Sequence, residues 1–156
     1  MKAFEIDTWL GTVLLADRDD GLVGLWFLHQ RHFPSGDENW VREKTERIGN
    51  AEDQLDDYFA GKRKQFDLPL APIGTPFQQA VWRKLRDIPY GQRKSYGQIA
   101  ASLGQPAAGR AVGAAVGRNP WSIIVPCHRV VGGSGQLTGY AGGLERKRRL
   151  LELEQT

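Results

Sequence analysis

The chain has 156 residues, of which 40% are hydrophobic and 25% charged, and its net charge is +3. No apolar run approaches the roughly 20 residues of a membrane helix, and the opening stretch MKAFEIDTWLG lacks the apolar core of a signal peptide. One cysteine, Cys127, and three histidines exclude an intramolecular disulfide and match no usual zinc pattern, so we expect a cytoplasmic protein without a metal site.

The charge is divided unevenly along the chain. Residues 1–74 hold nine Lys and Arg against 14 Asp and Glu, a net charge of −5, whereas residues 75–156 hold 12 against four, a net charge of +8. The sign changes after GKRKQFDLPLAPIG, whose two prolines and two glycines are typical of a linker. We therefore expect two domains, 1–74 and 75–156. A basic second domain suits a phosphate-backbone partner, but the same charge also fits a merely soluble surface.

The first domain reads as a small α/β (α+β) scaffold. Short stretches rich in Val, Leu, Phe and Trp alternate with turn signals and predict an antiparallel meander of strands at 2–7, 12–16 and 22–28. Residues 31–48 are polar and mixed, which indicates a loop or a marginal helix. Asn50 can cap a helix that runs to about Ala60, before Gly61. The residue pattern shows no chemistry in this domain.

The second domain begins with two helix-start signals. Thr75 and Gln78 form one expected capping box and Ser95 and Gln98 another, with Pro89 between the two helices. A third helix is expected from about residue 107 to residue 118. Short helices joined by a tight glycine-containing turn indicate a winged helix-turn-helix-like domain.

The third helix, AAGRAVGAAVGR, is built almost entirely from Ala, Gly and Val. Small side chains let a helix backbone approach its neighbour closely. They fit either tight packing against another helix or close approach to a nucleic-acid groove, and the basic domain favours the groove.

Three further segments complete the chain. Residues 121–125 are apolar and β-prone, and residues 132–140 indicate a flexible turn or wing. A last helix is expected over about 143–152, with apolar contacts from its leucines and dense positive charge at 146–149.

The residues around Cys127 carry the chemistry. A lone cysteine is most often a small buried hydrophobe, but here His128 follows it directly. A cysteine reacts as its thiolate, and a nearby base makes that form available. Neighbouring side chains in a strand point to opposite faces, so cooperation needs a turn or helical backbone, or an intervening water. An imidazole base works best when a carboxylate orients its other nitrogen, and the carboxylates downstream in this domain are Glu145, Glu152 and Glu154.

The run Pro126-Cys127-His128-Arg129-Val130 resembles the hallmark of the O6-alkylguanine-DNA alkyltransferase family, in its bacterial type. The resemblance covers residues 75–154 strongly, through the helix-turn-helix, the Asn119-Pro120 turn and the run from Tyr140 to Leu144. Residues 1–74 match only in general layout. It implies DNA repair in which Cys127 takes the alkyl group directly from O6-alkylguanine, and also from O4-alkylthymine, in double-stranded DNA. It also implies irreversible self-inactivation, no cofactor and a monomer.

The resemblance further implies catalytic roles for five residues. Cys127 would accept the alkyl group, His128 would take its proton through a water, and Glu154 would orient His128. Asn119 would hydrogen-bond the turn that builds the pocket, and Tyr96 would donate a proton toward N3 of guanine. Tyr96 could instead be a core aromatic, Asn119 a helix C-cap and Glu154 a surface charge near the terminus.

The remaining implied roles concern the partner. Arg110 would enter the base stack left by the extruded nucleotide, or would be one more phosphate contact. The expected DNA-binding residues are Arg110, Ala111, Gly113, Arg118 and Arg129. The carbonyl of Val130 would accept from the guanine amine, and Ala141 would belong to the loop facing O6. The expected pocket residues are Val130, Tyr140, Ala141, Trp121 and Ser122.

One departure from the family pattern and two alternative functions stay open. Trp121 is bulkier than the residue usual beside the pocket turn, so it could narrow the pocket or only pack against the first domain. Ser122 matches the bacterial-type branch, and Cys127 argues against the branch that binds lesions without repair. A helix-turn-helix regulator or lesion sensor would explain the basic domain but not Pro-Cys-His-Arg. A cysteine hydrolase would explain Cys127 and His128 but not the DNA-like domain.

Overall fold

The computed structural model describes residues 1–35 and 39–155. Within them the chain divides into two units, Met1–Ile73 and Gly74–Thr156. The first is a sheet with one long helix, and the second is mainly helical, so the α/β (α+β) class predicted from the sequence is confirmed. No helix among the described residues is long and apolar enough to cross a membrane.

The sheet of the N-terminal unit is the predicted antiparallel meander, extended by one short strand. Strands β1 (Lys2–Thr8), β2 (Gly11–Arg18) and β3 (Gly21–Phe27) pair in sequence order. Strand β4 (Val41–Arg42) adds to β1 in parallel, which gives the order β3-β2-β1-β4. The described residues of the 31–48 stretch include β4 and the start of a helix, where a loop or a marginal helix was expected; residues 36–38 of that stretch lie outside the described part of the chain.

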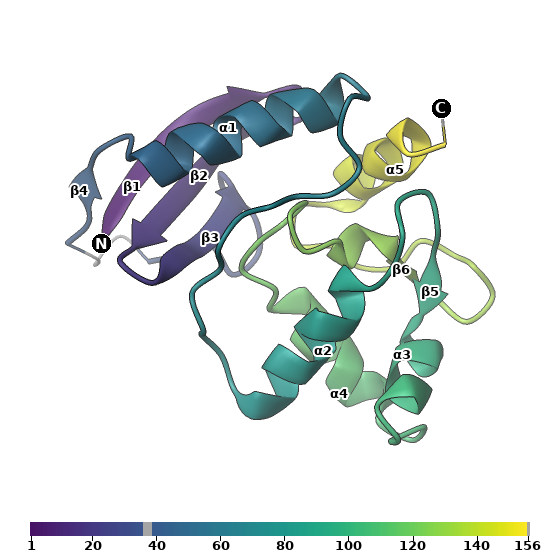
Figure 1. Ribbon diagram of the computed structural model, residues 1–156. Helices are drawn as coiled ribbons and strands as arrows, with labels where there is room; N and C mark the ends of the chain where they lie inside the picture. Colours follow the sequence, from purple (N-terminus) through teal and green to yellow (C-terminus); the bar gives the residue numbers. More distant parts are fainter. Residues whose placement is uncertain (36–38, 156) are drawn as a thin grey trace. The chain divides into compact units, whose positions relative to one another are not determined.

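Helix α1 (Glu46–Phe59) covers one face of this sheet (Figure 1). It begins earlier than predicted, because Thr45 and not Asn50 is the N-cap: the Thr45 hydroxyl accepts from the backbone N–H of Ile48 at 3.2 Å. The same hydroxyl donates to Asp17 of β2. Alternate side chains of β2 point to the same face, so Val13 and Leu15, both fully buried, face α1 as well.

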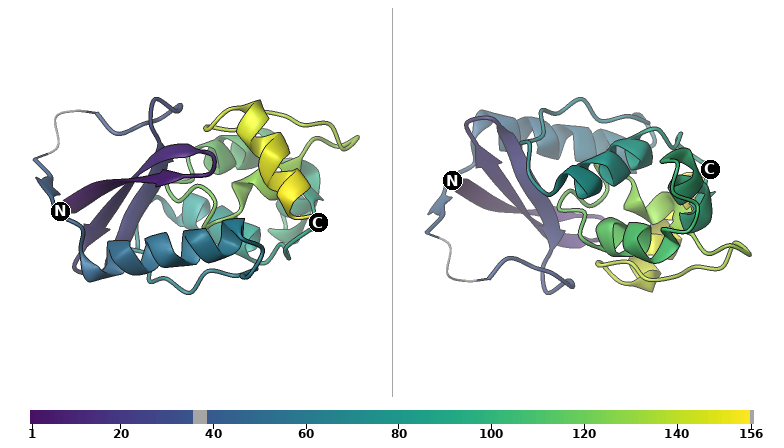
Figure 2. Two further views of the ribbon diagram at one scale, coloured as in Figure 1. Left: turned by 90° about the horizontal axis from the view of Figure 1, so that it is seen from above. Right: turned by 90° about the horizontal axis from the view of Figure 1, so that it is seen from below.

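On the opposite face of the sheet, described residues that follow β3 pack against a second apolar cluster (Figure 2). Trp26 of β3 stacks on Trp40 with ring centroids 5.9 Å apart, and Phe33 packs against the same cluster. The 61–74 stretch is not a free linker either. Leu22 donates to the Pro69 carbonyl at 2.9 Å and accepts from Ala71 at 2.9 Å, so residues 69–71 of this stretch lie beside the start of β3.

The C-terminal unit contains the predicted helices with small shifts in their bounds. They are α2 (Pro76–Arg86), α3 (Tyr96–Ser102), α4 (Gly109–Gly117) and α5 (Leu144–Leu153). Both predicted capping boxes are confirmed, at Thr75 with Gln78 and at Ser95 with Gln98. Helix α4 begins at Gly109 rather than near 107, after Ala108, whose side chain offers no cap.

Between α4 and α5 lies a segment with little regular structure. It holds a single 3-10 turn, η1 (Cys127–Arg129), and strand β6 (Val130–Val131), which pairs in parallel with β5 (Lys94–Ser95). Figure 1 shows β6 between α5 on one side and α2, α3 and α4 on the other. The β-prone residues 121–125 do not form a strand but a turn, in which Ile123 has a φ of 72°.

Helices α2 and α4 are joined by a buried tryptophan. The indole N–H of Trp82 donates to the Ala115 carbonyl of α4 at 2.8 Å, and both residues are buried. The indole ring also packs edge-on against Trp121, with centroids 5.5 Å apart. The Trp82 side chain therefore bonds α2 to α4 and packs α2 against the segment that follows α4.

We expect Trp82→Phe to lower the free energy of unfolding by about 1–3 kcal/mol, because the buried Ala115 carbonyl loses its indole donor. Urea unfolding followed by circular dichroism measures the loss. Trp9→Phe is the matched control, since Trp9 is 52% exposed, and its effect should stay within about 0.5 kcal/mol. Equal losses in both variants would contradict the assignment.

Candidate active site

The site is built on a turn that is wound around one amide side chain. Asn119 follows α4 and is 3% exposed. Its Nδ2 donates to the carbonyls of Trp121 (3.3 Å) and Val125 (2.9 Å), and its Oδ1 accepts from the Trp121 N–H at 3.0 Å. These bonds close the turn and hold Ile123 in the left-handed region, which a β-branched residue rarely adopts. The turn leads directly into Pro126 and Cys127.

Cys127 opens the 3-10 turn η1 and is 5% exposed. Burial raises the pKa of its thiol to about 11, while a hydrogen bond from Asn119 and the positive charge of Lys147 act in the opposite direction. The thiol is therefore protonated near neutral pH, and the thiolate forms only if another group takes the proton. Cys127 and His128 thus lie on a helical turn, one of the arrangements under which we expected their side chains to cooperate.

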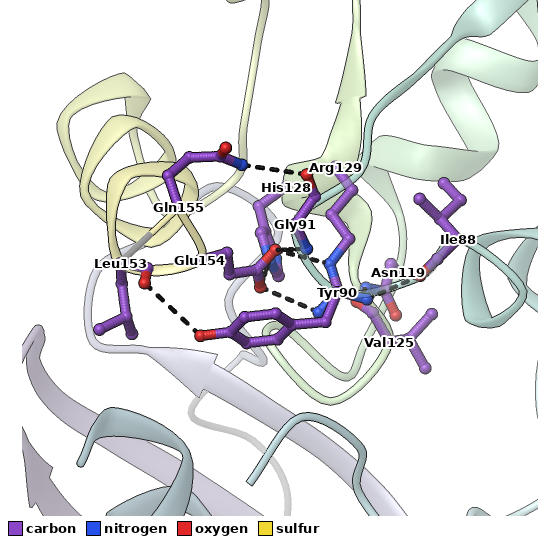
Figure 3. Close-up of polar contacts among 10 residues, drawn as sticks. All are labelled: Ile88, Tyr90, Gly91, Asn119, Val125, His128, Arg129, Leu153, Glu154 and Gln155. Carbon is purple, nitrogen blue, oxygen red and sulfur yellow. Dashed lines mark hydrogen bonds and ion pairs between the residues drawn. The ribbon is translucent and has the colours of Figure 1, made fainter. Parts of the chain in front are cut away.

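His128 is fully buried and forms a hydrogen bond from Nε2 to Oε2 of Glu154 at 2.7 Å (Figure 3). Burial lowers the pKa of His128, and Glu154 opposes that shift. The other ring nitrogen, Nδ1, has no hydrogen-bond partner in the part of the chain that the structure describes. A neutral imidazole oriented by a carboxylate, with one nitrogen open, is the arrangement of a general base.

Arg129, expected among the DNA contacts, is instead an internal residue. It is 6% exposed, and its guanidinium donates through Nε and Nη2 to Glu154 at 2.8 and 2.9 Å. Its Nη1 donates to the Ile88 carbonyl at 2.7 Å. The side chain is thus committed to neutralising Glu154, because a buried carboxylate needs a partner of opposite charge, and it is not exposed to a phosphate backbone.

Glu154 itself is held by the turn between α2 and β5, a contact that the sequence pattern did not indicate. Tyr90 and Gly91 lie in this turn, and the Gln155 amide donates to the Gly91 carbonyl at 3.0 Å (Figure 3). Gly91 has a φ of 80°, and a Cβ added there would lie 3.2 Å from the Glu154 carbonyl oxygen. Glycine suits this position because it adopts a positive φ easily and because it has no side chain to crowd Glu154.

Tyr96, at the start of α3, reaches the loop that precedes α5. Its hydroxyl lies 2.9 Å from Oγ1 of Thr138, and the Thr138 carbonyl accepts from Nζ of Lys147 at 2.8 Å. The expected basic cluster at 146–149 is consequently divided. Lys147 is fully buried, and burial lowers its pKa to about 8, whereas Arg148 pairs with Glu145 and Glu152 on the surface.

Helix α4 presents two faces. Val112, Ala115 and Val116 are buried, so part of the small-residue pattern serves packing. Gly113 lies against Tyr96, since a Cβ added to it would be 3.8 Å from the tyrosine ring. The expected DNA-binding residues Arg110, Ala111 and Arg118 are exposed, and their spacing places them on the other face of the helix.

The expected pocket residues differ in how far they are buried. Val130 and Ser122 are buried, and Ala141 and Tyr140 are half-buried. Burial, and to a lesser extent the charge of Cys127, raises the pKa of Tyr140. Trp121 is 4% exposed and packs on Trp82, so its ring belongs to the interior of the C-terminal unit. Leu144, expected to supply an apolar contact from α5, is 51% exposed.

No group of three or more His, Cys, Asp or Glu side chains able to hold a metal occurs in residues 1–35 and 39–155.

Both units have counterparts in known proteins. Residues 76–156 match the family described as 6-O-methylguanine DNA methyltransferase, DNA binding domain, and residues 4–72 match its ribonuclease-like domain. A methylated-DNA–protein-cysteine methyltransferase of Methanosarcina acetivorans is 50% identical over 93% of this chain and 92% of its own. One from Mycobacterium tuberculosis is 51% identical over 97% and 90%. The crystal structure of Mycobacterium tuberculosis OGT in complex with DNA is similar with a TM-score of 0.91 at 48% identity, covering 99% of this chain and 93% of that chain.

We expect Cys127 of the free protein to react slowly with iodoacetamide at pH 7, because a thiol pKa of about 11 keeps it protonated. The rate should then rise about tenfold for each pH unit up to about pH 10, as the thiolate fraction grows. Intact-mass spectrometry follows the reaction, since this is the one cysteine of the chain. In urea, which unfolds the protein and exposes the thiol, the reaction rate should level off near pH 8.5, about the pKa of an ordinary cysteine. A folded protein that levels off below pH 8 would contradict the burial effect.

Proposed function

Since this chain belongs to the 6-O-methylguanine DNA methyltransferase family, which repairs DNA by moving an alkyl group to a cysteine, we propose that Cys127 is the acceptor. The lesion is O6-alkylguanine in double-stranded DNA, with O4-alkylthymine as a second substrate. One observation carries the proposal: the single cysteine of the chain precedes a buried His128 that is hydrogen-bonded to Glu154 at 2.7 Å.

The reaction is a displacement at the alkyl carbon. The thiol proton passes through a water to Nδ1 of His128, and Glu154 stabilises the imidazolium that forms. The thiolate then forms the S–C bond while the C–O6 bond breaks, and the electron pair leaves with guanine. A hydrogen bond from Tyr96 to N3 stabilises the negative charge on the departing base, which is protonated afterwards. Asn119 keeps the turn and the sulfur in place.

DNA binds to the exposed face of α4. O6 lies inside the base-paired stack, so the nucleotide must rotate out before sulfur can reach its alkyl carbon. Arg110 then fills the gap in the stack, at a cost of a few kcal/mol for the unstacked step. Ala111 and Gly113 allow close approach of the helix, and Arg118 contacts the backbone. Arg129 acts inside the protein as the partner of Glu154.

The extruded base occupies a pocket next to Cys127. The Val130 carbonyl accepts from the exocyclic amine of guanine, and Ala141 lies in the loop that faces O6. Tyr140 and Ser122 line the same pocket. Trp121 influences the pocket indirectly, because its ring supports the Asn119 turn from the Trp82 side.

The protein acts once. A thioether is a poor leaving group, and His128 and Glu154 are placed to remove a proton, not to cleave an S–C bond. No cofactor is needed, because the reactive carbon arrives on the DNA. We further propose that residues 75–156 carry both the DNA-binding and the acceptor function, with residues 1–74 as scaffold. The protein acts as a monomer in the cytoplasm, where a reducing environment keeps the thiol intact.

Incubation with duplex DNA containing one O6-methylguanine should add one methyl group to Cys127, at a stoichiometry that stops at one per protein. Intact-mass and peptide mass spectrometry measure both the adduct and its site. Cys127→Ala should abolish transfer and keep DNA binding. An unmodified protein after saturating substrate, or continued turnover, would overturn the proposal.

Gly91→Ala should slow methyl transfer about tenfold or more, because its Cβ pushes the Glu154 segment away and loosens the His128 contact. Single-turnover kinetics and a DNA-binding assay separate chemistry from affinity, which should be unchanged. Gly61→Ala is the matched control, since Gly61 has a similar φ of 76° and a Cβ added to it would meet nothing within 4 Å. If both variants lose stability but neither loses rate, the positioning of Glu154 does not depend on this turn.

A further inference from the structure

Thr138 is the residue through which Tyr96 is tied to α5. Its hydroxyl oxygen lies 2.9 Å from the Tyr96 hydroxyl, and its carbonyl accepts from Nζ of Lys147 at 2.8 Å. The first contact joins positions 42 residues apart and the second joins positions nine apart. One residue of an otherwise irregular loop thus connects the start of α3 with a buried cation on α5.

Thr138 is held in place by the buried ammonium group of Lys147. The Lys147 side chain is fully buried, so its ammonium group can be satisfied only by groups inside the protein, and the Thr138 carbonyl is such a group. The loop itself is braced on either side of Thr138 by the Gly132–Gln136 backbone bond (2.9 Å) and the Gly143–Tyr140 bond (2.9 Å). On the far side, Tyr96 rests against Gly113 of α4.

The direction of the hydroxyl hydrogen bond follows from the substrate. A phenol has one proton to donate, and N3 of guanine carries only a lone pair. If Tyr96 is to donate to N3, it cannot also donate to Thr138, so the Thr138 hydroxyl must be the donor. A hydroxyl that accepts a hydrogen bond is polarised and donates its own proton more strongly.

We propose that Thr138, fixed by Lys147, is a positioning residue that donates to the Tyr96 hydroxyl and aims the Tyr96 proton at N3 of the extruded guanine. This inference rests on the proposed role of Tyr96. It adds to the reaction a chain of two hydroxyl groups, Thr138 to Tyr96 to N3, whose effect is on the departing base and not on the sulfur.

The first test uses an isosteric pair. Thr138→Val removes the hydroxyl and keeps the shape of the side chain, and we expect the single-turnover rate on O6-methylguanine DNA to fall about tenfold. Thr138→Ser keeps the hydroxyl and should restore most of the rate. Ser134→Ala removes a hydroxyl from the same loop, where it contacts only Gln136 among the described residues, and should leave the rate unchanged.

The second test removes the acceptor. In DNA carrying 3-deaza-O6-methylguanine a C–H group replaces N3, so the hydroxyl chain has nothing to act on. Wild-type protein should react more slowly with this substrate, and Thr138→Val should react at the same rate as wild type. A loss that persists on the 3-deaza substrate would assign Thr138 to loop structure alone and overturn the inference.

A double-mutant cycle separates this inference from the proposed function. In a Tyr96→Phe background Thr138→Val should cause no further loss. If Tyr96→Phe itself leaves the rate unchanged, the proposed role of Tyr96 fails. If Tyr96→Phe slows transfer but Thr138→Val does not, or if the two losses multiply, then only the inference about Thr138 fails.

Discussion

One buried carboxylate organises the C-terminal unit. Glu154 stands two residues from the end of the chain, yet it is 4% exposed and bonds to both His128 and Arg129. Moving a carboxylate out of water is costly, and only close charge-assisted hydrogen bonds offset that cost. Here the guanidinium supplies the compensating charge by donating to both carboxylate oxygens, and Oε2 is shared with the His128 ring, which is thereby oriented without being forced to become charged. The proposed catalytic pair of His128 and Glu154 therefore depends on Arg129 as well as on its own geometry.

This arrangement resolves an apparent conflict between burial and reactivity at Cys127. Burial raises the pKa of the thiol, which suppresses reaction with small electrophiles met by chance. A thiolate of high pKa is, however, intrinsically the stronger nucleophile once it is formed. In the proposed mechanism a neutral His128 creates that thiolate only when substrate is in place. Selectivity and reactivity are then two results of the same enclosed environment.

The sequence predicts those parts of the structure that depend on local rules. The meander, both capping boxes and the helical segments follow from turn residues, N-caps and periodicity within a few positions. The failures share a cause, because each depends on a distant partner. Residues 121–125 are β-prone by composition, but Asn119 bends them into a turn. Thr45 and not Asn50 is the cap of α1 because Thr45 also donates to Asp17.

In the candidate site, too, the sequence predicts the features that depend on neighbouring residues and misses those that depend on distant ones. The Cys127–His128 neighbourhood follows from the motif, whereas the sequence left open whether a turn, a helical backbone or a water would let the two side chains cooperate. The burial of Arg129 could not, since nothing in a basic side chain indicates whether it faces solvent or a carboxylate. The contacts of Gly91 and Thr138 arise from segments 63 and 42 residues away from their partners, a distance that no periodicity covers.

The burial of two cations in the C-terminal unit affects how strongly DNA binding depends on salt. Arg129 and Lys147 contribute to the net charge of +8 counted over residues 75–156, but both are buried, and Arg148 is already paired with two glutamates. Counterion release on DNA binding scales with the number of phosphates that cations neutralise. DNA binding should then release fewer counterions than the formal charge of +8 implies, so its affinity should depend less on ionic strength. More of the recognition then depends on how the helix fits the groove and the lesion.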